Sequence, residues 1–268
     1  MFDATHTPEA PAHDRETVRA VEFKQKTLKS AIGCAGIGLH SGKKISMTLK
    51  PAPIGTGVVF NRIDTAPGRD PLIPARYDAV IDTRLCTCVG NGAGLSVGTI
   101  EHLMSAIAGM GIDNLIVDID GPEVPVMDGS AAPFVFLIEC AGVVEQDAPR
   151  RAIKILQPIG IAEDGIMARL DPADDDFSVT FEIAFANPLI GRQRLDMTFP
   201  LTDAPATGPY RAEVSSARTF GFLEDVERLN KMGLALGGSL ENAVVISGNK
   251  VLNEEGLRFT DECVRHKA

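Results

Sequence analysis

Three stretches in the first half of the chain carry the hydrophobic pattern of β-strands. Residues 44–53 place Ile, Met and Leu at every second position before a proline stop. Residues 57–64 and 114–121 are short apolar runs that end in turn residues. Successive side chains of a strand point to opposite faces, so the alternation and the bounded apolar runs predict three strands.

Two helices are predicted between and after these strands. Residues 100–108 have apolar side chains at positions 100, 103, 104, 107 and 108, and Gly109 and Gly111 follow. This spacing is typical of a helix that packs one face on a sheet, and the glycines favour its end. The second helix follows residues 127–134, where Pro133 suits a first helical turn.

The pattern begins again after residue 150. Residues 155–172 and the alternating run 177–185 echo residues 27–51 and the run 57–64. A helix with Phe222, Val226 and Leu229 on one face then ends at Gly233, and the strand 242–248 follows. This loose internal duplication predicts an α+β fold of two similar halves, residues 22–150 and 151–268.

Composition adds limits to this picture. The chain is 44% hydrophobic and 23% charged, and it contains no apolar run of membrane-spanning length and no secretory signal at its start. We therefore expect a soluble cytoplasmic protein without a transmembrane segment. Residues 1–21 are rich in Pro, Ala, Thr and charge without apolar periodicity, which predicts a disordered extension.

Charge and cysteine content narrow the classes of partner. A formal net charge of -10 argues against nucleic acid, because binding to its backbone depends on clustered Lys and Arg. An anionic substrate must then be held by a few local cations. The five cysteines are an odd number without metal-site spacing, which favours reduced core residues over a disulfide framework.

Glu101 and His102 lie at the start of the first predicted helix, away from its apolar stripe. At 100° per residue, Glu101 lies roughly 90° from the stripe and His102 roughly opposite it. The face is either solvated, with Glu101 favoured by the helix dipole, or covered by the second half as a cleft between the domains. Composition alone does not choose between these interpretations.

A second histidine favours the cleft. Residues 256–268 predict a short helix with Thr260 as N-cap, acidic residues in its first turn, and then His266. If this helix occupies the equivalent place in the second half, His102 and His266 converge at the interface. Two neutral imidazoles with a carboxylate and a water would make a catalytic zinc site, beside a glutamate that takes the proton of the water.

Seven ordered stretches resemble the UDP-3-O-acyl-N-acetylglucosamine deacetylases, the zinc amidases of lipid A biosynthesis. The matching stretches are residues 25–44, 82–88, 99–114, 125–134, 217–222, 233–239 and 251–267. The resemblance implies two domains, each a two-layer sheet-and-helix unit, with the active site between them. It also implies a monomer that binds Zn²⁺ and a small UDP-linked acyl glucosamine.

The resemblance assigns roles to residues of this chain. Glu101 matches the general base, and His102 and His266 match two zinc ligands. Thr219 matches the threonine that hydrogen-bonds the oxyanion, Phe220 the aromatic residue against the sugar, and Lys267 a lysine that helps to bind the anionic substrate. His40 matches a family histidine near the site, although a histidine between glycines in a turn is more often structural.

The resemblance also predicts ligands that this sequence does not contain. The third zinc ligand of the family is an aspartate four residues after the second histidine, which corresponds to position 270, beyond Ala268. We therefore expect a chain truncated at the C-terminus, with an incomplete second domain. The favoured function is zinc-dependent hydrolysis of the N-acetyl group from the UDP-linked sugar, releasing acetate. The alternative is an inactive fragment or a non-catalytic protein of the same fold that binds the UDP-lipid.

Overall fold

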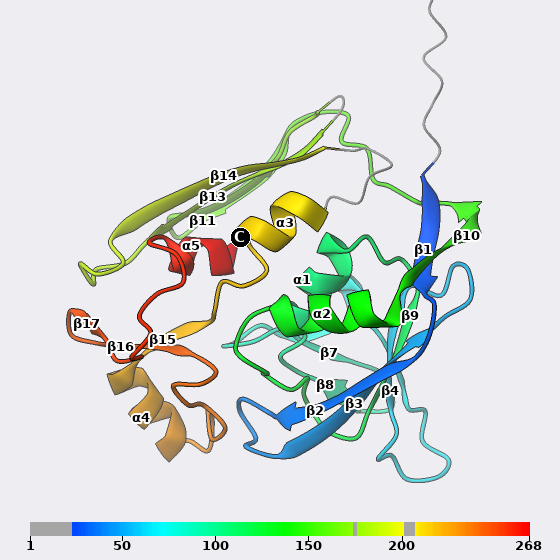
Figure 1. Cartoon of the computed structure of the whole chain (residues 1–268), viewed down its shortest axis with the longest axis horizontal. Helices are drawn as coiled ribbons and strands as arrows, with labels where there is room; N and C mark the ends of the chain where they lie inside the picture. The colour runs from blue at the N-terminus through cyan, green and yellow to red at the C-terminus, as the bar shows by residue number, and fades with distance from the viewer. Residues whose placement is uncertain (1–22, 174–175, 201–206) are drawn as a thin grey trace, which may run out of the picture.

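The computed structural model describes residues 23–173, 176–200 and 207–268 and shows a mixed α+β fold. The two halves of the chain lie beside each other, with the first half on the right in Figure 1. The predicted disordered extension, residues 1–21, lies outside the described residues. In the part of the chain described, no helix combines the length and apolar character that crossing a bilayer requires.

The first half is organised around a five-stranded sheet. Its strands, in spatial order, are β2 (Ile32–Ile37), β3 (Lys44–Pro51), β9 (Leu115–Ile119), β4 (Val58–Arg62) and β5 (Leu72–Pro74). The three strands predicted in this half correspond to β3, β4 and β9 and are confirmed. The strand β9 runs parallel to β4 and antiparallel to β3, so the chain enters the middle of the sheet after its first helix.

Two helices pack against this sheet, as predicted. They are α1 (Glu101–Gly109) and α2 (Ala132–Ala141), and Pro133 lies in the first turn of α2. Leu103 and Ile107 of α1 and Phe134 of α2 are buried in the same hydrophobic cluster as the sheet residues. Burial of this stripe fixes the orientation of α1, and with it the direction of the remaining side chains.

Smaller elements frame the sheet and lead into α1. The strand β1 (Lys24–Leu28) pairs antiparallel with β10 (Val143–Pro149), which closes the first half. A turn of 3-10 helix, η1 (Tyr77–Ala79), precedes a three-stranded sheet that ends directly before α1. That sheet consists of β6 (Val80–Asp82), β7 (Cys88–Gly90) and β8 (Ser96–Val97).

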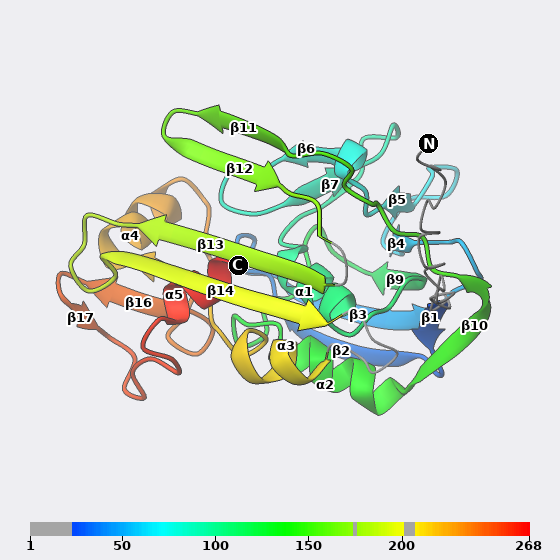
Figure 2. The same ribbon diagram turned by 90° about the horizontal axis from the view of Figure 1, so that it is seen from above.

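The second half contains two long hairpins instead of one continuous sheet. The hairpins are β11 (Ile159–Glu163) with β12 (Ile166–Leu170), and β13 (Asp176–Ala184) with β14 (Arg192–Pro200). They run side by side in Figure 2, but no pairing joins them among the described residues. The short helix α5 (Glu262–Lys267) packs on the β13–β14 hairpin.

A small sheet completes the second half. It consists of β15 (Phe220–Phe222), β16 (Val244–Ser247) and β17 (Lys250–Val251), with α4 (Leu223–Lys231) between β15 and β16. The predicted helix before Gly233 and the predicted strand 242–248 are therefore confirmed. A further helix, α3 (Thr207–Glu213), lies against α1.

The two halves differ in the size of their cores. One large cluster fills the first half, whereas the second half has two small clusters, one around Val244 and Ile246 and another around Leu195 and Val264. The α+β class is thus confirmed, while the domain boundary near residue 150 and the internal duplication stay predictions. All five cysteines are free, but only Cys263 is buried and Cys140 is exposed, so the expectation of core cysteines is wrong for Cys140.

Candidate functional site

His102 lies on the face of α1 that turns away from the helix's own stripe, and it is buried. Only 7% of the residue is exposed. The imidazole of His266, on α5 of the second half, lies against it with 5.1 Å between the ring centroids and 74° between the ring planes. The solvated interpretation of this face is therefore wrong, because the second half covers it.

The ring of His266 is oriented by the loop that precedes β15. Its Nδ1 lies 3.1 Å from the carbonyl oxygen of Ala217, which can only accept a hydrogen bond. Nδ1 therefore carries the proton, and the lone pair of the neutral ring lies on Nε2. The helix α5 begins one residue later than expected, with Asp261 and not Thr260 at its N-cap position.

Both imidazoles favour the neutral form. Burial lowers the pKa of His102 to about 3, with a further contribution from the neighbouring His266. Burial likewise lowers the pKa of His266 to about 4, opposed by the hydrogen bond to Ala217. Neutral imidazole is the form of histidine that coordinates a metal ion.

The spacing of the two rings fits joint coordination of one ion. Zinc binds imidazole nitrogen at about 2.0–2.1 Å, so two rings at a tetrahedral angle have centres roughly 5 Å apart. The observed 5.1 Å agrees with this value. Over residues 23–173, 176–200 and 207–268, no cluster brings three His, Cys, Asp or Glu side chains together around such a position.

Glu101 lies next to this pair, at the first position of α1. Its Oε2 accepts a hydrogen bond from the Thr87 amide at 3.0 Å. Burial raises the pKa of the Glu101 carboxyl group, while amide hydrogen bonds from Glu101 and Thr87 oppose the shift. Glu101, His102 and His266 all line one small pocket of about 70 Å³, so the predicted base and both predicted ligands face the same space.

Phe220 and Lys267, two further predicted site residues, lie near His266. The ring of Phe220 meets the ring of His266 edge to face, with 6.5 Å between centroids. The ammonium group of Lys267 lies above the Phe220 ring, 5.6 Å from its centroid. Of the predicted site residues, Phe220 thus lies beside His266 and Lys267 lies over Phe220, while Thr219 precedes Phe220 in the chain.

The backbone of Thr219 anchors the seam between the two halves. Its amide donates to the carbonyl oxygen of Gly129 at 2.7 Å, and its own carbonyl accepts from the Val244 amide at 2.8 Å. Gly129 adopts a φ of 81°, and a Cβ atom at this position would collide with the carbonyl oxygen of Asn242. Glycine is therefore required here for both conformation and close approach.

The structure also contains a larger pocket, of about 630 Å³. Its walls combine the segment before β7, which includes Leu85 and Cys86, with α4 and the turn after it, which include Leu229 and Met232. His40 also lines it, and both ring nitrogens are buried without a hydrogen-bond partner among the described residues. The structure thus places His40 at a pocket, while its catalytic or structural role stays a prediction.

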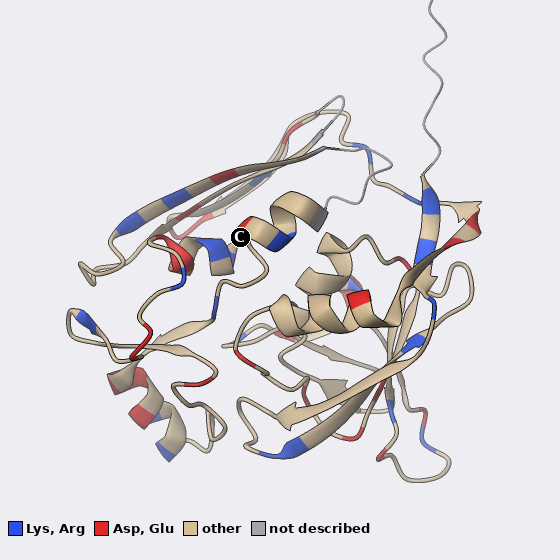
Figure 3. Ribbon diagram, viewed as in Figure 1, with Lys and Arg blue, Asp and Glu red and all other residues tan. Residues whose placement is uncertain are grey.

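Positive charge is dispersed over the molecule. Lys and Arg are interspersed with Asp and Glu on both halves, as Figure 3 shows. Along β14, Arg194 is paired with Asp196, and on α4 Arg228 is paired with Asp225. This distribution agrees with local cations such as Lys267 as contacts for an anion, and the absence of a nucleic-acid partner stays a prediction.

Two features of the site were not found from the sequence. One is the Ala217 carbonyl that orients His266. Every residue has a backbone carbonyl, so the residue type does not reveal this contact. The other is the buried pair of Arg218 and Glu262 beneath it. Glu262 was interpreted only as an acidic residue in a first helical turn, and nothing in the local pattern distinguishes an exposed carboxylate there from a buried one.

Comparison with known proteins gives consistent matches. The LpxC family model, described as UDP-3-O-acyl N-acetylglycosamine deacetylase, matches residues 25–268. A relative from Acidithiobacillus ferrooxidans, named UDP-3-O-acyl-N-acetylglucosamine deacetylase, is 52% identical over 251 residues, covering 91% of this chain and 78% of the relative. A relative of the same name from Myxococcus xanthus is 50% identical over 250 residues, covering 93% of this chain and 76% of the relative.

A third relative of that name, from Pseudoalteromonas atlantica, is 49% identical over 245 residues, covering 91% of this chain and 78% of the relative. The family match includes Glu101, His102, Thr219 and the helix that carries His266. This chain therefore belongs to the UDP-3-O-acyl-N-acetylglucosamine deacetylase family.

Proposed function

We propose that the protein hydrolyses the N-acetyl group of UDP-3-O-acyl-N-acetylglucosamine, with zinc, as a step of lipid A biosynthesis. The observation that carries this proposal is the meeting of two neutral imidazoles from opposite halves, 5.1 Å apart, beside Glu101. Family membership supplies the substrate class, because the relatives carry the name of this deacetylase. The expectations of a monomeric, cytoplasmic protein stay predictions.

In this proposal His102 and His266 hold the ion through one nitrogen each. The Ala217 carbonyl fixes the Nδ1–H tautomer of His266 and leaves Nε2 for coordination. When bound, zinc increases the acidity of water and polarises a carbonyl group.

Glu101 is proposed as the general base. It accepts a proton from the water that attacks the acetamide carbon, and it passes that proton to the sugar nitrogen when the carbon–nitrogen bond breaks. The products are acetate and the free amine. The Thr87 amide holds one carboxylate oxygen, which leaves the other for proton transfer.

The second half is proposed to bind and orient the substrate. The Thr219 hydroxyl donates to the carbonyl oxygen as negative charge develops there, a contribution typically worth roughly 3 to 4 kcal/mol for one preorganised donor. Phe220 lies against the sugar ring, and Lys267, held above that phenyl ring, contacts the anionic part of the substrate. The apolar walls of the 630 Å³ pocket, from Leu85 to Met232, accommodate the 3-O-acyl chain.

The test combines metal analysis with a deacetylase assay. We expect the purified 268-residue protein to bind one zinc per chain and to release acetate from UDP-3-O-acyl-N-acetylglucosamine. The full-length relative from A. ferrooxidans serves as the positive control. Zinc binding without acetate release would contradict catalysis by this chain, and release that persists after complete removal of metal would contradict the role of zinc.

One observation favours the non-catalytic alternative, in which the protein binds the UDP-lipid without hydrolysing it. Within the described residues only two imidazoles meet at the proposed zinc position. A chain extended with a third ligand at position 270 tests this alternative directly. Equal zinc content and turnover in both chains would contradict the non-catalytic alternative.

A further inference from the structure

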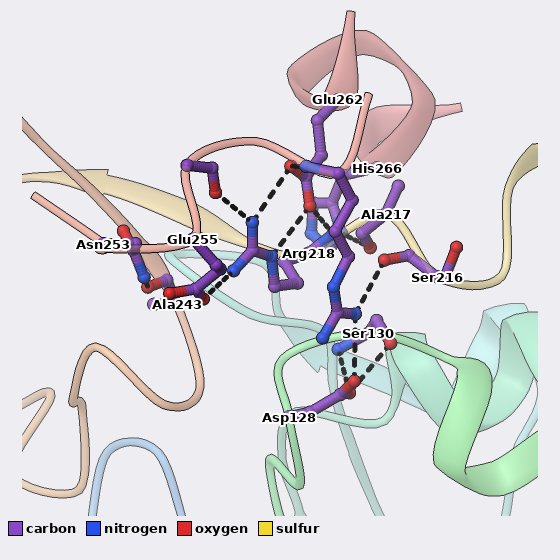
Figure 4. A network of polar contacts seen from close by, with 12 residues as sticks. Asp128, Ser130, Ser216, Ala217, Arg218, Ala243, Asn253, Glu255, Glu262 and His266 are labelled. Atoms are coloured by element: carbon purple, nitrogen blue, oxygen red, sulfur yellow. Dashed lines mark hydrogen bonds and ion pairs between the residues drawn. The ribbon is translucent and has the colours of Figure 1, made fainter. Parts of the chain in front are cut away.

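Arg218 and Glu262 form a buried ion pair directly behind the proposed zinc site. Arg218 is 2% exposed and Glu262 is 1% exposed. Arg218 lies in the segment that enters β15, and Glu262 lies in the first turn of α5. Figure 4 shows this pair at the centre of a polar network that also includes His266.

The network satisfies the polar groups of both side chains. The Glu262 carboxylate accepts hydrogen bonds from the Nε of Arg218 at 2.9 Å, from the Arg218 amide at 2.9 Å and from the Arg258 amide at 2.7 Å. The guanidinium group of Arg218 also donates to Glu255 at 2.6 Å and to the carbonyl oxygen of Gly256 at 2.7 Å. Three charged side chains, Arg218, Glu255 and Glu262, are thereby joined.

Stability alone does not explain such a pair. Removing two charges from water costs several kcal/mol per ion, and well-packed apolar residues often replace a buried pair without loss of stability. In some proteins a buried pair is retained for the single geometry that its hydrogen bonds define. The geometry defined here is the position of α5 against the segment 217–219.

That geometry determines where the proposed site residues lie. Glu262 precedes His266 by one helical turn, so both side chains project from the same face of α5. Ala217, whose carbonyl oxygen holds Nδ1 of His266, is the residue before Arg218, and Thr219 is the residue after it. The Arg218–Glu262 pair therefore fixes the position of the His266 ring relative to Thr219.

A second link fixes the same segment to the first half. Arg258, whose amide binds Glu262, donates from its side chain to Asp128 at 3.0 Å and to the Ser216 carbonyl at 2.9 Å. Asp128 lies in the loop that also supplies the Gly129 carbonyl to Thr219. The network consequently spans the seam across which His102 and His266 meet.

We infer that Arg218 and Glu262 are positioning residues, whose buried pairing holds the Ala217 carbonyl against His266 and so presents the Nε2 of that ring to the metal. This inference rests on the proposed function for the identity of the metal. Its structural content, the fixed tautomer and orientation of His266, does not depend on catalysis.

The principal test is Glu262→Gln in the full chain, which keeps the shape of the side chain and removes its charge. We expect zinc affinity, measured by competition with a chromogenic chelator, to fall about 10- to 100-fold, the usual effect of changing a group that orients a metal ligand. In the metal-free protein, NMR of the His266 ring should show loss of the single Nδ1–H tautomer. Wild-type zinc affinity and an unchanged tautomer would overturn the inference.

The double variant Arg218→Met with Glu262→Leu separates positioning from folding. An apolar pair should restore or raise the unfolding midpoint, while zinc affinity remains 10- to 100-fold weaker and the tautomer mixed. If zinc affinity recovered together with stability, the pair would contribute to folding and not to the positioning of His266. This variant also keeps the inference testable if Glu262→Gln fails to fold.

Glu255→Gln is the matched control. Glu255 binds the same arginine, but its side chain is 58% exposed and makes no contact with α5 in the network. We expect zinc affinity within twofold of wild type and an unchanged tautomer. If the wild-type protein itself bound no zinc and released no acetate, the proposed function would fail, whereas the tautomer measurement would still decide the positioning role.

Discussion

The two histidines of the candidate site are held in place by different interactions. His102 projects from a helix whose opposite stripe is part of the large hydrophobic cluster of the first half. His266 projects from a six-residue helix whose neighbours form two small clusters, and a buried ion pair lies at its base. Apolar packing positions one ring, and directional hydrogen bonds position the other.

This contrast has a physical consequence. A large core resists displacement of a helix because many contacts must be lost together, whereas a short helix has little stability of its own and depends on specific partners. Charge-assisted hydrogen bonds have preferred distances and angles, so they define a position even where little apolar area is buried. The site therefore combines two kinds of support. His102 is held rigidly by the large core, whereas the position of His266 is well defined but easily disturbed.

The largest expected effect comes from the rigid half. Glu101→Gln should lower acetate release about 10²- to 10⁴-fold, the range typical of a lost general base. The glutamine oxygen can still accept the Thr87 amide, so the unfolding midpoint should stay at its wild-type value. Glu139→Gln, which alters an exposed pair with Arg211, is the control for a glutamate without a proposed role. Equal activity of the two variants would remove Glu101 from the mechanism.

Matched truncations compare the two cores directly. Leu103→Ala in the first half and Leu195→Ala in the second remove the same atoms from buried positions, which are 0% and 6% exposed. Such changes cost about 2–5 kcal/mol of unfolding free energy, depending on how far the surroundings collapse. We expect Leu103→Ala near the upper end and Leu195→Ala near the lower end by denaturant titration. The reverse order would contradict the contrast between the two halves.

Zinc itself should stabilise the two halves unequally. A ligand at about 100 times its dissociation constant stabilises the folded state by about 2.7 kcal/mol. Since His102 already stands on a large core, we expect zinc to slow amide hydrogen exchange mainly in α5 and the segment 217–219, with little change in α1. Equal protection of α1 and α5 would indicate that α5 is as firmly held without metal as α1.

The smallest effect is expected in the β11–β12 hairpin. Ile161 is 74% exposed, so Ile161→Thr should change the unfolding free energy by no more than about 0.5 kcal/mol. Val117→Thr in β9 is the buried counterpart, at 0% exposure, and should cost substantially more because its hydroxyl enters the main cluster. A large loss from Ile161→Thr would show that this hairpin is covered in solution.

Local pattern was sufficient to predict three strands of the first half, β3, β4 and β9, and its two helices. The apolar positions of α1 and the alternation of β3 follow from burial on one face. One-sided burial produces a periodic pattern of apolar residues, which can be seen in the sequence. His102 was left with two interpretations because whether its face is covered depends on a segment more than a hundred residues later. Its convergence with His266 was a hypothesis based on the internal duplication, and the family resemblance then assigned both residues as zinc ligands.

Features that depend on three-dimensional context were missed or wrongly predicted. The N-cap of α5 is Asp261 and not Thr260. Arg218 and Glu262, among the most buried polar residues, have residue types that are usually exposed. Their burial follows from the close approach of β15, α5 and the loop before it, and no periodicity within any one of these segments encodes that approach.

Gly129 gives the seam a fixed width. Where two domains are joined only by a flexible linker, their separation fluctuates, and any site shared between them opens and closes with it. Here the loop of one half rests directly on the backbone of the other, at a place with no room for even a methyl group. The distance between the two imidazoles therefore depends on direct van der Waals contact between the two halves. A Cβ atom at position 129 would push the halves apart and increase the separation of the rings.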